Sequence, residues 1–162
     1  MRAAIEKFRM PRYREISDVG LYLEQTVKYI NGVLAPLGCM EVTASMVSNY
    51  VKNGFVPAPV KKQYFADQIA YLMAVVILKR VLSMEHIGRL FEMQKKTYSN
   101  ETAYDYFCME LENMLMYIFG LKDTVEQIGV SSSETKQMLR SAIIAAANII
   151  YLNNRFEKLN KA

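Results

Sequence analysis

The sequence predicts an all-helical protein, and three observations support this prediction. Glycine and proline, the residues that break helices, number only 7 and 4 among 162 residues. Apolar residues make up 52% of the chain and charged residues 22%, a balance typical of a packed globular core. Long stretches of the chain repeat apolar residues every three or four positions, which places them along one face of a helix.

The first sixteen residues predict a basic N-terminal arm. Pro11 interrupts the segment, and Glu6 is the only acidic residue among its first fourteen positions. The sequence leaves open whether this segment contacts phosphate groups or is a frayed terminus. The basic residues of the arm are Arg2, Lys7, Arg9, Arg12 and Arg14.

Two helices are expected next in a domain that spans residues 17–96. The first begins after Ser17 or Asp18, either of which can cap it, and ends before Pro36. The second begins at Thr43, a good N-cap residue. Gly54 then ends this helix, because glycine readily adopts the left-handed conformation found at helix C-termini.

An extended segment and two further helices complete this predicted domain. Two prolines exclude a helix between Phe55 and Phe65, so this segment is interpreted as an extended excursion or a small hairpin. A third helix is predicted from Ala66 to Val81. Ser83 then caps a short fourth helix that runs to about Lys95.

Residues 97–162 predict a C-terminal helical region for dimerisation or effector binding. A helix ends at Gly120, and a linker near residues 129–133 precedes a second, longer helix. The stretch Tyr98–Phe119 is rich in Met and Tyr, which suits an effector pocket as well as core or dimer packing. The second helix carries a heptad-spaced apolar seam that can pair within the chain or, as we prefer, in a homodimer. The seam consists of Met138, Ala142, Ala145, Ile149, Leu152, Phe156 and Leu159.

Several functional classes lack sequence support. No apolar run reaches the ~20 residues of a membrane span, and no signal-peptide segment begins the chain, so we expect a cytoplasmic protein without membrane association. Cys39 and Cys108 form no CxxC pair and are interpreted as buried thiols. His86 is the only histidine, and no metal-binding, phosphate-loop or nucleophile motif accompanies it. We therefore expect no enzymatic activity, no cofactor and no metal site.

The charge of the chain is divided unevenly between its halves. Residues 1–96 hold 14 Lys and Arg against 8 Asp and Glu, a difference of +6, whereas residues 97–162 hold 6 against 8, a difference of −2. A basic first half indicates an anionic partner or simply a solvated basic surface.

The segment from Thr43 to Phe65 contains the candidate site residues. It holds three lysines and no acidic residue, as a surface that displaces counterions from DNA requires. The helix from about 43 to 53 presents Ser45, Ser48, Asn49, Lys52 and Asn53 outward, where short polar side chains can reach base edges. Lys61, Lys62 and Tyr64 follow in a loop, about 57–65, that can lie along a phosphate backbone; Tyr64 can alternatively pack beneath it.

The order of these features resembles the DNA-binding domain of the MerR family of bacterial regulators. In that family the recognition helix ends in Tyr, followed by Gly, two apolar residues and Pro, as with Tyr50 and Gly54-Phe55-Val56-Pro57. An Arg-x-Tyr wing corresponds to Lys62-Gln63-Tyr64, and a second helix-turn-helix begins like Ser83-Met84-Glu85-His86-Ile87. The departures are Ser48 and Lys62, where the family has Arg, and a longer first helix. The resemblance implies a MerR-like winged helix-turn-helix.

A second resemblance extends over nearly the whole chain. Leu21 to Gln25, Thr43 to Lys52 and Pro59 to Tyr64 are similar to a bacterial family known as domain of unknown function 1836, and this implies transcription regulation. The sequence thus predicts a regulator that binds double-stranded DNA as a homodimer, through the recognition helix and wing, with a possible small-molecule effector. The alternative is a non-enzymatic protein-interaction module that keeps the same shape.

Overall fold

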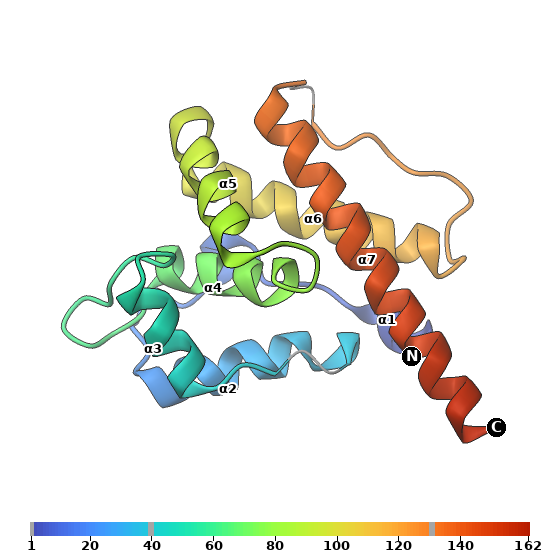
Figure 1. The fold of residues 1–162 in the computed structure, drawn as a ribbon, viewed down its shortest axis with the longest axis horizontal. Helices are drawn as coiled ribbons and strands as arrows, with labels where there is room; N and C mark the ends of the chain where they lie inside the picture. The colour runs from blue at the N-terminus through green and yellow to red at the C-terminus, as the bar shows by residue number, and fades with distance from the viewer. Residues whose placement is uncertain (1, 39–40, 130–131) are drawn as a thin grey trace.

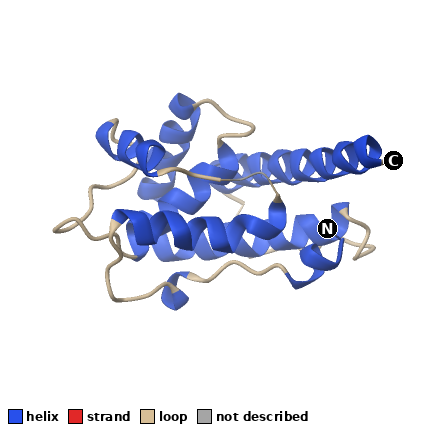
Figure 2. Cartoon of the chain, turned by 90° about the horizontal axis from the view of Figure 1, so that it is seen from below, coloured by secondary structure: helices blue, strands red, loops and turns tan. Residues whose placement is uncertain are grey.

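The computed structural model describes residues 2–38, 41–129 and 132–162, and within them the fold is helical (Figures 1 and 2). These residues contain isolated antiparallel bridges but no strand. The expectation of an all-α protein is therefore confirmed. The elements are α1 (Arg2–Lys7), a 3-10 turn (Tyr13–Glu15), α2 (Leu23–Leu34), a second 3-10 turn (Ala35–Leu37), α3 (Ala44–Lys52), α4 (Ala66–Leu78), α5 (Met84–Thr97), α6 (Asn100–Ile118) and α7 (Glu134–Lys161).

Helix α4 is the centre of the fold. All of its residues from Gln68 to Leu78 are buried. It contacts α2 on one side and α6 and α7 on the other (Figure 1). Gln68 is polar, but its side chain accepts the Phe65 N–H at 2.9 Å and donates to the Ala58 carbonyl at 3.1 Å. The central helix is thus apolar around most of its circumference, and its buried amide is satisfied.

Helix α7 buries one face as far as Asn154, and its last turns are exposed. Ile143, Ala146 and Ile150 are buried, and α7 contacts α4, α5 and α6, as expected for a segment that is apolar on nearly every side. The helix then extends past its neighbours (Figures 1 and 2). Within the heptad seam Ala142 is buried and Ile149 is half-buried, whereas Met138, Ala145, Leu152, Phe156 and Leu159 are exposed.

The predicted basic arm is wrong, because the first residues pack onto α6. Ile5 and Met10 are buried, and Arg2–Lys7 form a helix. Arg12 makes two hydrogen bonds with Glu112, of 2.7 and 2.8 Å, and both side chains are about one-fifth exposed. Two more arginines of the segment pair with carboxylates, Arg9 with Glu15 and Arg14 with Glu101. Three of its positive charges are thereby neutralised within the chain.

Most of the predicted helix boundaries agree with the structure, and there are two exceptions. Thr43 and Ser83 cap α3 and α5, accepting backbone N–H groups from Met46 and His86. Helix α2, however, begins at Leu23, not directly after Ser17 or Asp18. Helix α4 ends at Leu78, three residues before the predicted Val81. Cys108 is buried as expected. Cys39 and residues 130 and 131 of the predicted linker lie outside the described residues.

The buried side chains of the described residues form one hydrophobic cluster. The boundary predicted between residues 96 and 97 coincides with the end of α5 at Thr97. Buried residues from both sides of that boundary, such as Leu90 and Phe107, belong to the same cluster.

Candidate nucleic-acid interface

Helix α3 is held against the body of the protein by one apolar face. Val47 has no exposed surface, and Met46, Tyr50 and Val51 are half-buried against the core. The Lys79 ammonium, at the end of α4, donates a hydrogen bond of 3.2 Å to the Tyr50 hydroxyl and lies 5.9 Å from the centre of its ring. These contacts fix which face of α3 points outward.

The connection between α2 and α3 is held by Asn31 from α2. Its side-chain amide donates to the Val42 carbonyl at 2.9 Å, and its oxygen accepts the Val42 N–H at 2.8 Å. Val42 itself is only 2% exposed. One side chain therefore satisfies both backbone groups of a buried residue just before Thr43, and so sets where α3 begins.

The C-terminal end of α3 has the left-handed glycine that the sequence predicts. Gly54 has a φ of 79°. The Phe55 N–H bonds the Tyr50 carbonyl at 3.0 Å, and the Gly54 N–H bonds the Val51 carbonyl at 3.1 Å, the pair of bonds of a Schellman motif. The Phe55 ring then lies close to Gly88, because a Cβ at Gly88 would stand 3.2 Å from it. The residue that follows the C-terminal glycine of α3 therefore packs against α5.

The outward face of α3 is polar and free of acidic side chains. All five predicted site residues of this helix are exposed: Ser45, Ser48, Asn49, Lys52 and Asn53. Exposed Glu41 is the nearest acidic residue in the sequence on the N-terminal side, two positions before Thr43. The structure therefore presents a row of short hydrogen-bonding groups and one cation to solvent.

A tight turn next to α3 carries two more lysines. Val60 and Gln63 exchange two backbone hydrogen bonds, each of 2.9 Å, around Lys61 and Lys62. Both lysines have positive φ, 51° and 66°, as a two-residue type I′ turn requires. This conformation strains residues other than glycine and asparagine. Both lysines are exposed at the tip, and in Figure 1 this loop and α3 lie at the same end of the molecule.

The turn is anchored through Tyr64 to the segment before α2. Leu21 and Tyr64 form an antiparallel bridge. Tyr64 is only 4% exposed, so its ring packs beneath the loop, the second of the two roles that the sequence allowed it. Burial raises the pKa of its hydroxyl above the ordinary value. Gly20 fits closely here, because a Cβ on it would lie 2.7 Å from Gln63 Cβ.

Three residues that position this surface were not predicted from the sequence: Gly20, Leu21 and Asn31. The partners of these residues lie 11 to 45 positions away, so no pattern near the residues themselves predicts the contacts. Elsewhere in the described chain, no group of three or more His, Cys, Asp or Glu residues could hold a metal ion. Among the same residues, no helix has the length and apolar character needed to cross a bilayer.

Comparison with known proteins gives a family and no function. A family model described as domain of unknown function (DUF1836) matches residues 11–107, more than half of the chain. The match includes α2, α3, the lysine turn, α4 and α5. No curated protein and no solved structure matches the chain.

Proposed function

Since the chain belongs to this DUF1836 family, whose function is unknown, we propose a function from the interface: the protein is a transcriptional regulator that binds duplex DNA. The observation that carries the proposal is the acid-free outward face of α3 beside the exposed pair Lys61 and Lys62. In this account α2 and α3 act as a MerR-like helix-turn-helix, and the lysine turn acts as its wing.

Each part of the surface has a different task in this proposal. Asn49 and Ser48 face base edges in the major groove, where Asn can make two hydrogen bonds with adenine. Lys52 and Asn53 at the end of α3, and Ser45 near its beginning, contact base edges or adjacent phosphates. Lys61 and Lys62 contact the phosphate backbone and carry no sequence information. Tyr64 supports the turn from below.

The strained geometry of the lysine turn favours this assignment. Asn-Gly is the sequence that a type I′ turn accommodates most easily, because both central residues need positive φ. Lys61 and Lys62 occupy those positions and direct two cations into solvent at the tip. Strained backbone of this kind is typical of functional positions. The gain in phosphate contact is our explanation for lysine at both of them.

The proposed assembly is a homodimer through the free end of α7. Leu152, Phe156 and Leu159 are 44%, 60% and 63% exposed and continue the heptad spacing of the helix. A second α7 would cover this stripe. Two-fold symmetry would then present two copies of α3 to two half-sites and so raise the affinity for a palindromic site.

One observation favours the alternative, a protein-interaction module. Val19, Tyr22 and Val60 are 69%, 56% and 55% exposed and lie close in sequence to the Leu21–Tyr64 bridge. Exposed apolar groups at such a place are typical of a surface that binds protein. In this reading the two lysines flank an apolar contact and do not engage phosphates.

A salt titration with duplex DNA separates the two functions. Fluorescence anisotropy of a labelled duplex of mixed sequence is measured with the full chain between about 50 and 200 mM salt. With Lys52, Lys61 and Lys62 on phosphates, log K falls with log salt at a slope of about −3 for one protomer and about −5 for a dimer. Absence of binding at the lowest salt concentration would favour the interaction module.

A further inference from the structure

A pocket of about 400 Å³ lies between α6, the beginning of α7 and the connection that joins them. Its walls are mainly apolar and include Tyr98, Met109, Ile128 and Leu139. A volume of this size suits a small organic molecule rather than single waters. The pocket lies in the half of the chain that the candidate DNA interface does not use.

Two residues that line this pocket carry hydrogen-bond donors with unused capacity. The Tyr106 hydroxyl oxygen is buried and has no hydrogen-bond partner among the described residues. The Lys136 ammonium lies 5.2 Å from the centre of the Tyr106 ring and donates one hydrogen bond to the Ile128 carbonyl. An ammonium carries three N–H groups, so Lys136 retains donors for a ligand. A buried hydroxyl without a partner costs free energy that a ligand acceptor would recover.

The acidic groups near these donors are already engaged. Glu110 is 1% exposed, and Arg140 donates to it at 3.0 Å. Asp105 lines the pocket, and its carboxylate accepts the Tyr13 N–H at 2.8 Å. Burial raises the pKa of Glu110, and the charge of Lys136 acts on it at longer range in the opposite direction, but Lys136 forms no ion pair within 4.0 Å with a described residue. It can therefore still attract an anionic group.

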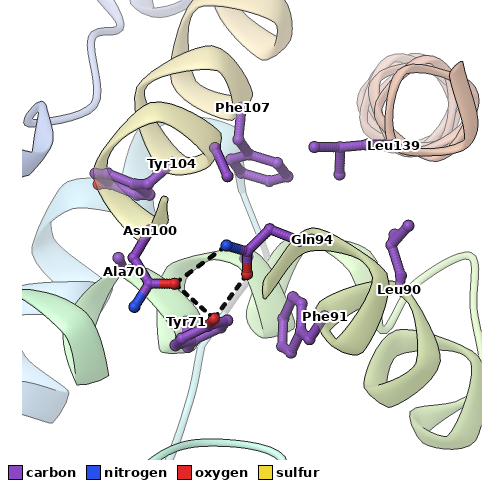
Figure 3. Close-up of a pocket in the computed structure, with 11 residues that line it drawn as sticks. Ala70, Tyr71, Leu90, Phe91, Gln94, Asn100, Tyr104, Phe107 and Leu139 are labelled. Carbon is purple, nitrogen blue, oxygen red and sulfur yellow. Dashed lines mark hydrogen bonds between the residues drawn. The ribbon is translucent and has the colours of Figure 1, made fainter. Parts of the chain in front are cut away.

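The inner wall of the pocket adjoins a second, smaller cavity. This cavity measures about 50 Å³ and shares Gln94, Ala103 and Leu139 with the larger pocket. Figure 3 shows Phe107 and Leu139 facing each other across it, above a polar cluster in which Gln94 bonds Tyr71 at 2.7 Å. The cavity is apolar apart from that cluster. A ligand held at Lys136 could therefore place an apolar body against Leu139.

From these contacts we propose that the pocket binds a small molecule with an apolar body and an anionic oxygen group, a carboxylate or a sulfonate. The anionic group accepts hydrogen bonds from Tyr106 and Lys136. The body packs against Met109, Ile128 and Leu139. This site is independent of the proposed DNA binding, because none of its residues belongs to α3 or the lysine turn.

Two dyes with the same aromatic body test the site on the full chain. 8-Anilino-1-naphthalenesulfonate carries the anionic group, and N-phenyl-1-naphthylamine lacks it. Fluorescence titration is expected to show saturable binding of the sulfonate at least about fivefold tighter than the neutral amine. Lys136→Met should abolish this preference. Tyr106→Phe should lower the affinity for the sulfonate by about threefold and leave the affinity for the amine unchanged.

Two further variants show whether the dyes bind in this pocket and whether a loss of binding has another cause. Lys161→Met removes a distant exposed cation and should leave both affinities as in the wild type. Met109→Trp enlarges a side chain that is 43% exposed at the pocket and should block both dyes without unfolding the protein. Equal affinity of the two dyes for the wild type, or an unchanged sulfonate preference in Lys136→Met, would overturn the proposal.

Discussion

Leu21 and Tyr64 exchange two backbone hydrogen bonds. The Leu21 N–H donates to the Tyr64 carbonyl at 3.0 Å, and the Tyr64 N–H donates to the Leu21 carbonyl at 2.7 Å. This pair ties the start of the helical pair α2 and α3 to the end of the lysine turn. Because α2 packs against α3, this pairing links the helical pair to the lysine turn across 43 positions of sequence.

The lysine turn is the first place to test the interface. Changing Lys61 and Lys62 together to Glu should weaken binding to every duplex at least about tenfold at ~100 mM salt, because phosphate contacts are independent of sequence. Anisotropy titration measures the loss. Lys158→Glu with Lys161→Glu makes the same charge change on α7, off the apolar stripe, and should retain wild-type affinity. An equal loss in both variants would assign the effect to net charge alone.

Asn49 is expected to carry sequence preference. Asn49→Ala should reduce affinity for a preferred duplex by about 1–3 kcal/mol and leave affinity for unrelated sequences nearly unchanged, because a base-edge contact is lost. Competition titrations with preferred and unrelated duplexes measure both affinities. An equal loss of affinity for all sequences would indicate that Asn49 contacts the DNA phosphate backbone and not a base edge. Asn160→Ala makes the same change at an exposed position of α7, away from the proposed interface, and should leave both affinities at the wild-type values.

Gly20 should control how the turn is seated. Its missing Cβ would lie 2.7 Å from both Gln63 Cβ and Phe65 Cζ, so Gly20→Ala should lower the free energy of unfolding by about 1–3 kcal/mol. Gly32→Ala is the control, because a Cβ there meets nothing within 4 Å. That change, in an exposed position inside α2, should stabilise the protein by about 0.5–1 kcal/mol. Urea denaturation that gives both variants the same sign would refute the close packing at Gly20.

The exposed stripe on α7 should determine the oligomeric state. Leu152→Glu with Phe156→Glu should convert a dimer into an 18.6 kDa monomer, as measured by light scattering after size exclusion. Both side chains are exposed, on the opposite side of α7 from the buried Asn154, so the stability of the monomer should change little. Lys158→Glu with Lys161→Glu should remain dimeric. A wild-type chain that is monomeric at high concentration would contradict the proposed assembly.

Stability should decrease in alkaline solution because of Tyr71. Burial raises the pKa of its hydroxyl to about 12, and the Asp67 carboxylate adds to the shift. The unfolded chain releases this proton near pH 10, whereas the folded chain keeps it until about pH 12. The free energy of unfolding therefore falls between these values. Urea denaturation at pH 9 and pH 11 should show a smaller fall in Tyr71→Phe, and an equal fall would exclude Tyr71 as a cause.

The candidate interface could be predicted wherever its causes are local. Thr43 caps α3, Gly54 ends it, and apolar spacing around Val47 sets its buried face, all within about a dozen residues. The exposed positions of Ser48 and Lys52 follow from the same spacing. Short-range signals thus sufficed for the outward face of α3.

What the sequence could not predict depends on distant partners. The start of α2 at Leu23 follows from the Leu21–Tyr64 pairing, which outweighs the capping tendency of Ser17 or Asp18. The basic arm became a packed segment because Arg12 meets Glu112, 100 positions away. Such pairings leave no periodic pattern near either residue.

The most direct test of DNA recognition is selection of bound duplexes from a random DNA library by the full chain at near-physiological salt. We expect an enriched palindrome, whose two half-sites are separated by the distance between the two α3 helices of the dimer. No enrichment, together with no salt-dependent retention of bulk DNA, would contradict the account and leave the interaction module as the function of this surface.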